Sequence, residues 1–235
     1  MPSPTTAPLP PPSHRPAPDA PAPGSAPPLL RGWLHLVAAV TAVGVAPFVV
    51  VRGRTPGEMA ALAVYMASIA ALFGVSAAFH RIRWSLAGRR RMRRADHATI
   101  FVAIAGTYTA VAGLALGGWA QILVLSLVWT GAAVGIAVRQ IWLDAPKWAV
   151  AIPYVVVGWS ALAVLPSLLH SLGGTGFTLL VLGGAAYTAG ALVYARQRPD
   201  PVPGVFGYHE VFHACTVVGA TLHLVVILAF ALPRA

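Results

Sequence analysis

Charged residues are what this sequence most lacks, because Asp, Glu, Lys and Arg together make up only 9% of its 235 residues. A soluble domain carries roughly a quarter charged residues, so this composition excludes an ordinary soluble protein. Cysteine is also nearly absent: Cys215 is the single one, which excludes an intrachain disulfide framework. The sequence holds no Gly-rich phosphate loop, no dinucleotide fingerprint and no Ser-His-Asp order.

Hydrophobic residues, by contrast, make up 57% of the chain. Seven stretches reach the length of roughly 18 apolar residues that a membrane-spanning helix needs. We expect these spans at residues 33–51, 59–80, 98–118, 120–138, 148–166, 175–195 and 211–232. The predicted fold class is therefore an all-α integral membrane protein, a seven-transmembrane helix bundle occupying residues 29–235. Residues 1–28 hold twelve of the 21 prolines, and we expect them to form a disordered cytosolic tail.

The formal net charge of +10 is distributed as in a membrane protein rather than a nucleic-acid-binding one. Of the 16 Lys and Arg residues, 13 fall in the N-terminal tail and in the loops after the second, fourth and sixth predicted spans. Cytoplasmic loops carry the excess of basic residues, so we expect a cytoplasmic N-terminus and an external C-terminus. The loop from Arg81 to Arg94 alone holds seven arginines, and we expect it to rest on anionic lipid head groups. No aromatic-interleaved basic fold accompanies this charge, so we expect no nucleic-acid partner.

This topology brings five chemically capable side chains to one depth. The second span ends at the cytoplasmic face with Ser76 and His80, the third begins there with Asp96, and the seventh begins there with His209 and His213. Histidines at i and i+4 share a helix face. Three histidines with one open position are a familiar composition for catalytic zinc. Asp96 would hold or deprotonate the zinc water, and Ser76 could bond that water or a developing oxyanion.

Simpler interpretations of two of these residues stay open at this point. Asp96 could be a helix N-cap, or it could pair with Arg93 or Arg94. His80 taken alone could be an interfacial histidine. The pair of His209 and His213 favours a metal by itself, and the common depth of His80 and Asp96 with this pair makes a metal site the better interpretation.

The segment from His209 to His213 also fits the His-Glu-x-x-His pattern of zinc proteases, in which Glu210 would be the general base. Asp144 could be imagined as the remote ligand of such a site. We discount this interpretation because Asp144 lies in a polar loop beside Lys147, and because Ser76, His80 and Asp96 would then have no role.

Four other residues are candidates for this site by their chemistry. His223 lies about 21 Å further along the helix than His209 at 1.5 Å per residue, so we expect it to be a polar partner in the core. Cys215 is rotated away from the histidine face. His35 is near the right depth on the first span, and His97 beside Asp96 could support the site indirectly.

Several motifs, in order along the chain, resemble the hemolysin III family, the bacterial branch of the progestin and adiponectin receptor superfamily. They are Arg31-Gly32-Trp33-Leu34-His35, Ser76-Ala77-Ala78-Phe79-His80, Asp96-His97, Ile104-Ala105-Gly106-Thr107-Tyr108-Thr109 and His209-Glu210-Val211-Phe212-His213 with a later His223. The resemblance implies a seven-helix bundle in the bacterial inner membrane, with zinc near its cytoplasmic face. It also implies that His80, His209 and His213 bind this Zn²⁺, while Asp96 contacts it through water with Ser76 beside it.

Alkaline ceramidases belong to the same superfamily, so the resemblance implies hydrolysis of a lipid amide, whereas the hemolysin name implies cytolysis or pore formation. Our leading hypothesis is a zinc-dependent hydrolase of a lipid amide or ester. The alternative is a non-enzymatic channel, cytolytic protein or receptor-like sensor with structural zinc. The chain departs from many relatives at Arg31-Gly32-Trp33, where they carry an acidic residue and an asparagine. It also has Ala110 where they commonly have proline.

Overall fold

The computed structural model of the chain describes residues 27–234, and no β-strand occurs within them. The elements are α1 (Trp33–Val50), α2 (Pro56–Arg81), α3 (Leu86–Ala115), α4 (Gly118–Ile141), α5 (Lys147–Gly158), η1 (Ser160–Val164), α6 (Leu165–Arg196), α7 (Tyr208–Val226), η2 (Ile227–Ala231) and η3 (Leu232–Arg234). The all-helical class predicted from the sequence is therefore confirmed. The predicted disorder of residues 1–28 falls almost wholly outside the described residues.

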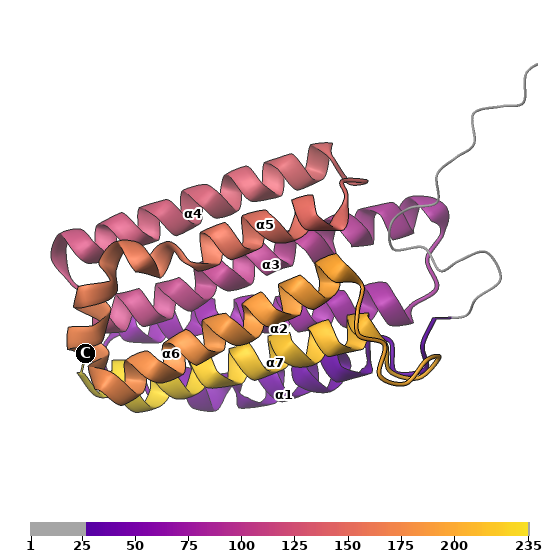
Figure 1. Ribbon diagram of the computed structural model, residues 1–235. Helices are drawn as coiled ribbons and strands as arrows, with labels where there is room; N and C mark the ends of the chain where they lie inside the picture. Colours follow the sequence, from indigo (N-terminus) through magenta and orange to yellow (C-terminus); the bar gives the residue numbers. More distant parts are fainter. Residues whose placement is uncertain (1–26, 235) are drawn as a thin grey trace, which may run out of the picture.

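Six helical stretches in the described part of the chain are long and apolar enough to cross a membrane. Five of them correspond one to one with predicted spans. The other, Lys147–Arg196, is 50 residues long and contains two predicted spans, at 148–166 and 175–195. Inside it Gly173 has φ 69° and ψ 172°, a backbone conformation that glycine adopts without a Cβ clash. Figure 1 shows the chain turning back in this stretch, so that α5 and α6 lie side by side.

The helices form one bundle in which α2 packs on α1 and α3, and α6 packs on α5 and α7. The core between them is apolar and contains Leu62, Tyr65, Phe101, Val124 and Ile227, none more than 1% exposed. Large apolar side chains also cover much of the outer surface, as a lipid-facing surface requires. The described start of the chain and its C-terminus lie at opposite ends of the bundle (Figure 1).

The third helix begins earlier than the sequence predicted. Ser85 caps α3 by accepting a hydrogen bond from the Gly88 N–H at 3.2 Å, so the helix starts well before the predicted span at residue 98. Most of the predicted loop from Arg81 to Arg94 is therefore helical, which corrects that prediction. The alternative interpretation of Asp96 as an N-cap is excluded for the same reason, because Asp96 lies about three turns inside the helix. Arginine is a good helix former, so a charged helix end can extend beyond the apolar layer.

Candidate metal centre

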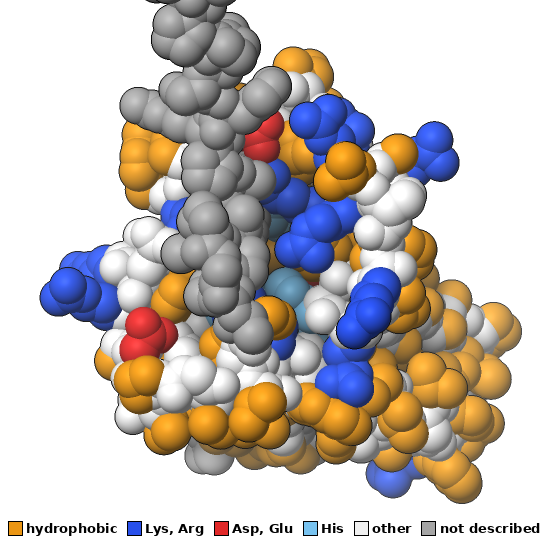
Figure 2. Space-filling view, turned by 90° about the vertical axis from the view of Figure 1, so that its right-hand side faces the viewer, with side chains coloured by type: hydrophobic (Ala, Val, Ile, Leu, Met, Phe, Trp, Pro, Cys, Tyr) orange, Lys and Arg blue, Asp and Glu red, His pale blue; other side chains and the backbone are white. Residues whose placement is uncertain are grey.

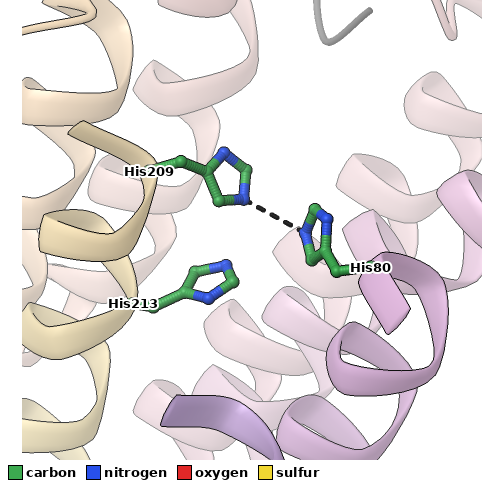
Figure 3. A group of neighbouring side chains, drawn as sticks. All are labelled: His80, His209 and His213. Atoms are coloured by element: carbon green, nitrogen blue, oxygen red, sulfur yellow. Dashed lines mark hydrogen bonds between the residues drawn. The ribbon is translucent and has the colours of Figure 1, made fainter. Parts of the chain in front are cut away.

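Three histidines from two helices meet at one end of the bundle. His80 is the second-to-last residue of α2, while His209 and His213 lie in the first two turns of α7. One ligand nitrogen from each lies within 4.8 Å of the other two. The Nε2 atoms of His209 and His80 are 3.1 Å apart, and Figure 3 shows the three imidazoles facing a common point. His209 and His213 are buried and His80 is half-buried.

This arrangement fits a zinc ion. A tetrahedral ion with Zn–N bonds of about 2.0–2.1 Å holds its ligand nitrogens about 3.3–3.4 Å apart. One pair of nitrogens is 3.1 Å apart and all three lie within 4.8 Å of one another, which is close enough to that value for small side-chain rotations to suffice. Neutral imidazoles are suitable zinc ligands, and a three-histidine set leaves a fourth position open.

The start of α7 is fixed by a buried ion pair. Glu210 is fully buried, and its Oε1 accepts a hydrogen bond from Arg31 Nε at 2.5 Å. Its Oε2 accepts another from the Gly207 N–H at 2.9 Å. Through Arg31, the Glu210 carboxylate therefore joins the segment before α1 to the first turn of α7, and through Gly207 it also binds the backbone at the start of α7. Glu210 supports the backbone that carries His209 and His213.

A fourth histidine supports the cluster from α1. The His35 ring stacks on the His213 ring, with centroids 3.7 Å apart and planes 10° apart. The Thr216 hydroxyl donates its only hydrogen to the His213 carbonyl at 2.8 Å, so it accepts from His35 Nε2 at 2.9 Å. His35 thus holds the plane of the His213 ring. Its depth on the first span was the signal that made it a candidate in the sequence.

A cavity of about 130 Å³ adjoins the histidine cluster. Its lining brings two of the clustered histidines together with the predicted Ser76 and Asp96 and with two other residues considered from the sequence: His209, His213, Ser76, Asp96, His97 and His223. Ser76 is buried and Asp96 half-buried. Most of the remaining wall is apolar, including Phe79, Ile100, Ile104 and Val155. A carboxylate and a hydroxyl therefore face the same apolar space as the histidine pair of α7.

Sequence reasoning missed Arg139, a buried residue near the end of α4. Its Nη2 lies 2.6 Å from His97 Nδ1, and it also donates to the carbonyls of Trp142 at 2.7 Å and Leu143 at 3.0 Å. A guanidinium group can only donate, so His97 Nδ1 is the acceptor. In a neutral His97 ring the proton is then on Nε2. A buried arginine within a predicted membrane span is the sequence signal for such a role, because buried charges in membrane helices usually have a function.

The end of the bundle that holds the histidines is strongly basic. Figure 2 shows this end, where Lys and Arg side chains surround an opening in which histidine is visible. Lys147 Nζ donates to the Tyr208 hydroxyl at 2.6 Å, and the Arg81 guanidinium lies 3.6 Å over the Trp33 ring.

Asp144 lies away from the histidine cluster. Its side chain is 69% exposed and forms an ion pair with Arg93 at 2.8 Å. It is not among the clustered ligand residues of the described chain, so the remote-ligand role imagined for a protease site has no support. The other rejected candidate, Cys215, packs against Gly190 of α6.

The sequence was also compared with known proteins. A family model described as Haemolysin-III related matches residues 26–224. The chain is similar to "Hemolysin-3" of Bacillus cereus, with 28% identity over 181 residues that cover 77% of this chain and 80% of that protein. It is also similar to "Hemolysin-3 homolog" of Bacillus subtilis (strain 168), with 32% identity over 125 residues covering 53% and 56% of the two chains.

Six apolar helices together with these bacterial relatives indicate a multi-pass protein of the cell membrane. The family match extends over most of the chain and includes every residue of the histidine cluster. The chain belongs to the hemolysin III family.

Proposed function

We propose that this protein is a zinc-dependent hydrolase of the membrane that cleaves a lipid amide or ester. His80, His209 and His213 would hold the ion. The observation that carries the proposal is the cavity beside this cluster, which joins Asp96 and Ser76 to an apolar wall. A site with structural zinc alone would not need such a cavity.

When bound, a zinc ion lowers the pKa of its water to roughly 7 and polarises a carbonyl oxygen. Asp96 would accept a proton from the water that attacks the substrate carbonyl and then deliver it to the leaving amine or alcohol. The Ser76 hydroxyl would donate to the oxygen on which negative charge develops. Arg139 keeps His97 oriented beside Asp96.

The surroundings of the site favour a lipid substrate. The apolar wall would accept an acyl chain, because burying apolar surface is favourable. The basic rim in Figure 2 would attract an anionic or polar head group at the membrane surface. We therefore include the exposed arginines of the segment from Arg81 to Arg94 in the proposal as head-group contacts, but not Arg93, which is buried and paired with Asp144.

We further propose that the chain crosses the membrane seven times, with its N-terminus in the cytoplasm. At 1.5 Å per residue the stretch Lys147–Arg196 would be about 75 Å long if straight, more than twice the roughly 30 Å of a hydrocarbon core. The reversal near Gly173 supports two crossings in this stretch. The described start of the chain and its C-terminal end lie at opposite ends of the bundle, which also supports an odd number of crossings.

Two competing functions make different use of these residues. A protease of the His-Glu-x-x-His type needs a free Glu210 carboxylate. Here one carboxylate oxygen accepts a hydrogen bond from Arg31 and the other accepts one from the Gly207 N–H. A non-enzymatic protein with structural zinc would lose thermal stability without zinc but would have no turnover to lose.

Metal content tests the first part of the proposal. We expect one zinc per purified wild-type chain, and a loss of most of it in His209→Ala and His213→Ala. His170→Ala is the matched control, because His170 is exposed on α6 and should keep full zinc content. Wild-type protein without stoichiometric zinc would contradict the proposal.

Turnover tests the second part. We expect the wild type to release fatty acid from N-acyl amide or acyl ester lipids presented in micelles. Asp96→Asn should keep its zinc but lose roughly 10²–10⁴-fold in rate, the usual contribution of a general base. Zinc binding with no hydrolysis of either lipid class would favour the structural-zinc alternative, and full activity in Asp96→Asn would refute the mechanism.

A further inference from the structure

A second cavity of about 80 Å³ continues the first one along the bundle. The two cavities share six lining residues: Thr107, Tyr108, Gly158, Trp159, Gly184 and His223. The second cavity is otherwise lined mainly by apolar side chains, including Leu116, Val124 and Leu168. Together the two cavities extend from the histidine cluster along the interior of the bundle.

The shared wall contains four polar side chains, and two of them are bonded to the backbone around them. The Thr107 hydroxyl donates to the Ala103 carbonyl at 2.8 Å. The Tyr108 hydroxyl donates to the Gly158 carbonyl at 2.7 Å and accepts from the Ala161 N–H at 2.7 Å. These groups need no ligand to satisfy their hydrogen bonds.

The third polar side chain is Trp159, whose Nε1–H donates to the Thr188 hydroxyl at 3.0 Å. The fourth, His223, is different. Its Nε2 lies 3.1 Å from the Leu180 carbonyl, which can only accept, so Nε2 carries the hydrogen. In the neutral ring Nδ1 is then an acceptor, and it has no hydrogen-bond partner among the described residues. His223 is only 8% exposed, and a buried polar group without a partner is unfavourable.

The neighbouring helix fixes the position of the His223 ring. A Cβ atom at Gly183 would overlap the Cδ2 and Nε2 atoms of His223, so the ring lies directly against the backbone of α6. The ring of Tyr187 lies beside it, with centroids 5.6 Å apart. The His223 side chain, which lines both cavities, is therefore held in place where they join.

We propose that His223 is a specificity-determining residue whose Nδ1 accepts a hydrogen bond from a hydroxyl group on the hydrocarbon chain of the lipid. Ten residues separate His213 from His223 on one helix, which is about 15 Å along its axis. The lipid hydroxyl therefore lies near the middle of the hydrocarbon chain when the lipid carbonyl is at the histidine cluster. This inference rests on the proposed function for the position of the carbonyl, and it selects lipids with a mid-chain hydroxyl group.

Binding of free fatty acids tests the inference without requiring turnover. Wild-type protein in detergent is titrated with octadecanoic acid and with its isomers that carry one hydroxyl near the carboxyl group, in mid-chain or near the methyl end. We expect the mid-chain isomer to bind about tenfold more tightly than the unsubstituted acid, the usual size of one net hydrogen bond. The other isomers should bind no more tightly than the unsubstituted acid. A mid-chain isomer with no advantage would overturn the inference.

A variant and a control test whether the preference for the mid-chain isomer depends on His223. His223→Leu removes the acceptor and should abolish the preference while the unsubstituted acid still binds, whereas His170→Leu should retain the preference. The wild-type series decides the matter by itself if His223→Leu does not fold. Asp96→Asn should bind the series in the same order as the wild type. A mid-chain preference in a protein that hydrolyses no lipid would refute the proposed function but not this inference.

Discussion

Glu210 lies between the two histidines of α7 in the sequence, but its carboxylate serves a different purpose. It is one residue past His209, so at 100° per residue it occupies another face of the helix. The fully buried carboxylate accepts hydrogen bonds from Arg31 and from the Gly207 N–H. Breaking such a pair leaves a charge without its partner in a buried setting.

We therefore expect Glu210→Gln to lower stability without removing the metal. The free energy of unfolding should fall by about 1–3 kcal/mol, the cost of an unsatisfied buried group. Zinc content and the rate of lipid hydrolysis should stay within about twofold of the wild type, because the neutral side-chain amide of the introduced Gln can still accept the hydrogen bond from the Gly207 N–H. Thermal unfolding in detergent together with metal analysis measures both.

A double-mutant cycle with Arg31→Gln is the control for this prediction. If the two side chains act through one ion pair, the double variant should be less destabilised than the sum of the single ones. Loss of all activity in Glu210→Gln with normal zinc content would instead support the protease interpretation.

At the scale of helices, close contacts in the bundle depend on the absence of side chains. A Cβ at Gly135 of α4 would overlap the ring of Phe101 on α3. Phe101 is fully buried and packs on Tyr154 with ring centroids 4.6 Å apart, so it has no room to move. By contrast, nothing lies within 4 Å of a Cβ placed at Gly44 of α1.

Gly135→Ala should therefore destabilise the bundle, while Gly44→Ala should not. Overpacking of a buried contact costs about 1–3 kcal/mol. Gly44→Ala should leave the unfolding temperature unchanged or slightly raised, because alanine is the better helix former. Equal unfolding temperatures for the two variants would show that α3 and α4 do not pack as described.

The boundaries of α3 show what hydropathy can predict about a helix. Apolar sequence marks the part of a helix inside the bilayer, but the helix itself begins at its cap, Ser85. The arginines after the cap continue the helix because their backbone hydrogen bonds do not depend on side-chain polarity. The predicted span was correct in place but too short at its N-terminal end.

At the scale of the whole molecule, the seven-crossing topology can be tested with single cysteines in a Cys215→Ser background. Arg52→Cys, Thr175→Cys and Gln197→Cys all place the thiol at exposed positions between helices or near the break in α6. A membrane-impermeant maleimide should label the first two in intact cells, and the third only after the membrane is permeabilised. If Lys147–Arg196 crossed only once, residue 175 would lie in the bilayer and would not be labelled.

The sequence by itself determined the helical membrane class and the common depth of the five predicted residues. Hydropathy and the i, i+4 spacing of His209 and His213 are local properties, so they survive without knowledge of packing. Charge counting then supplied a predicted orientation that would place Ser76, His80 and Asp96 in the same layer.

Only the tertiary structure decided which side chains at that depth touch. The stacking of His35 on His213 joins α1 to α7, and the contact of Arg139 with His97 joins α4 to α3. The proposed role of His223 likewise depends on the two cavities that its side chain lines, and the sequence alone does not predict them. Such contacts depend on the rotation and crossing of helices far apart in the chain, which hydropathy and spacing within one helix do not encode.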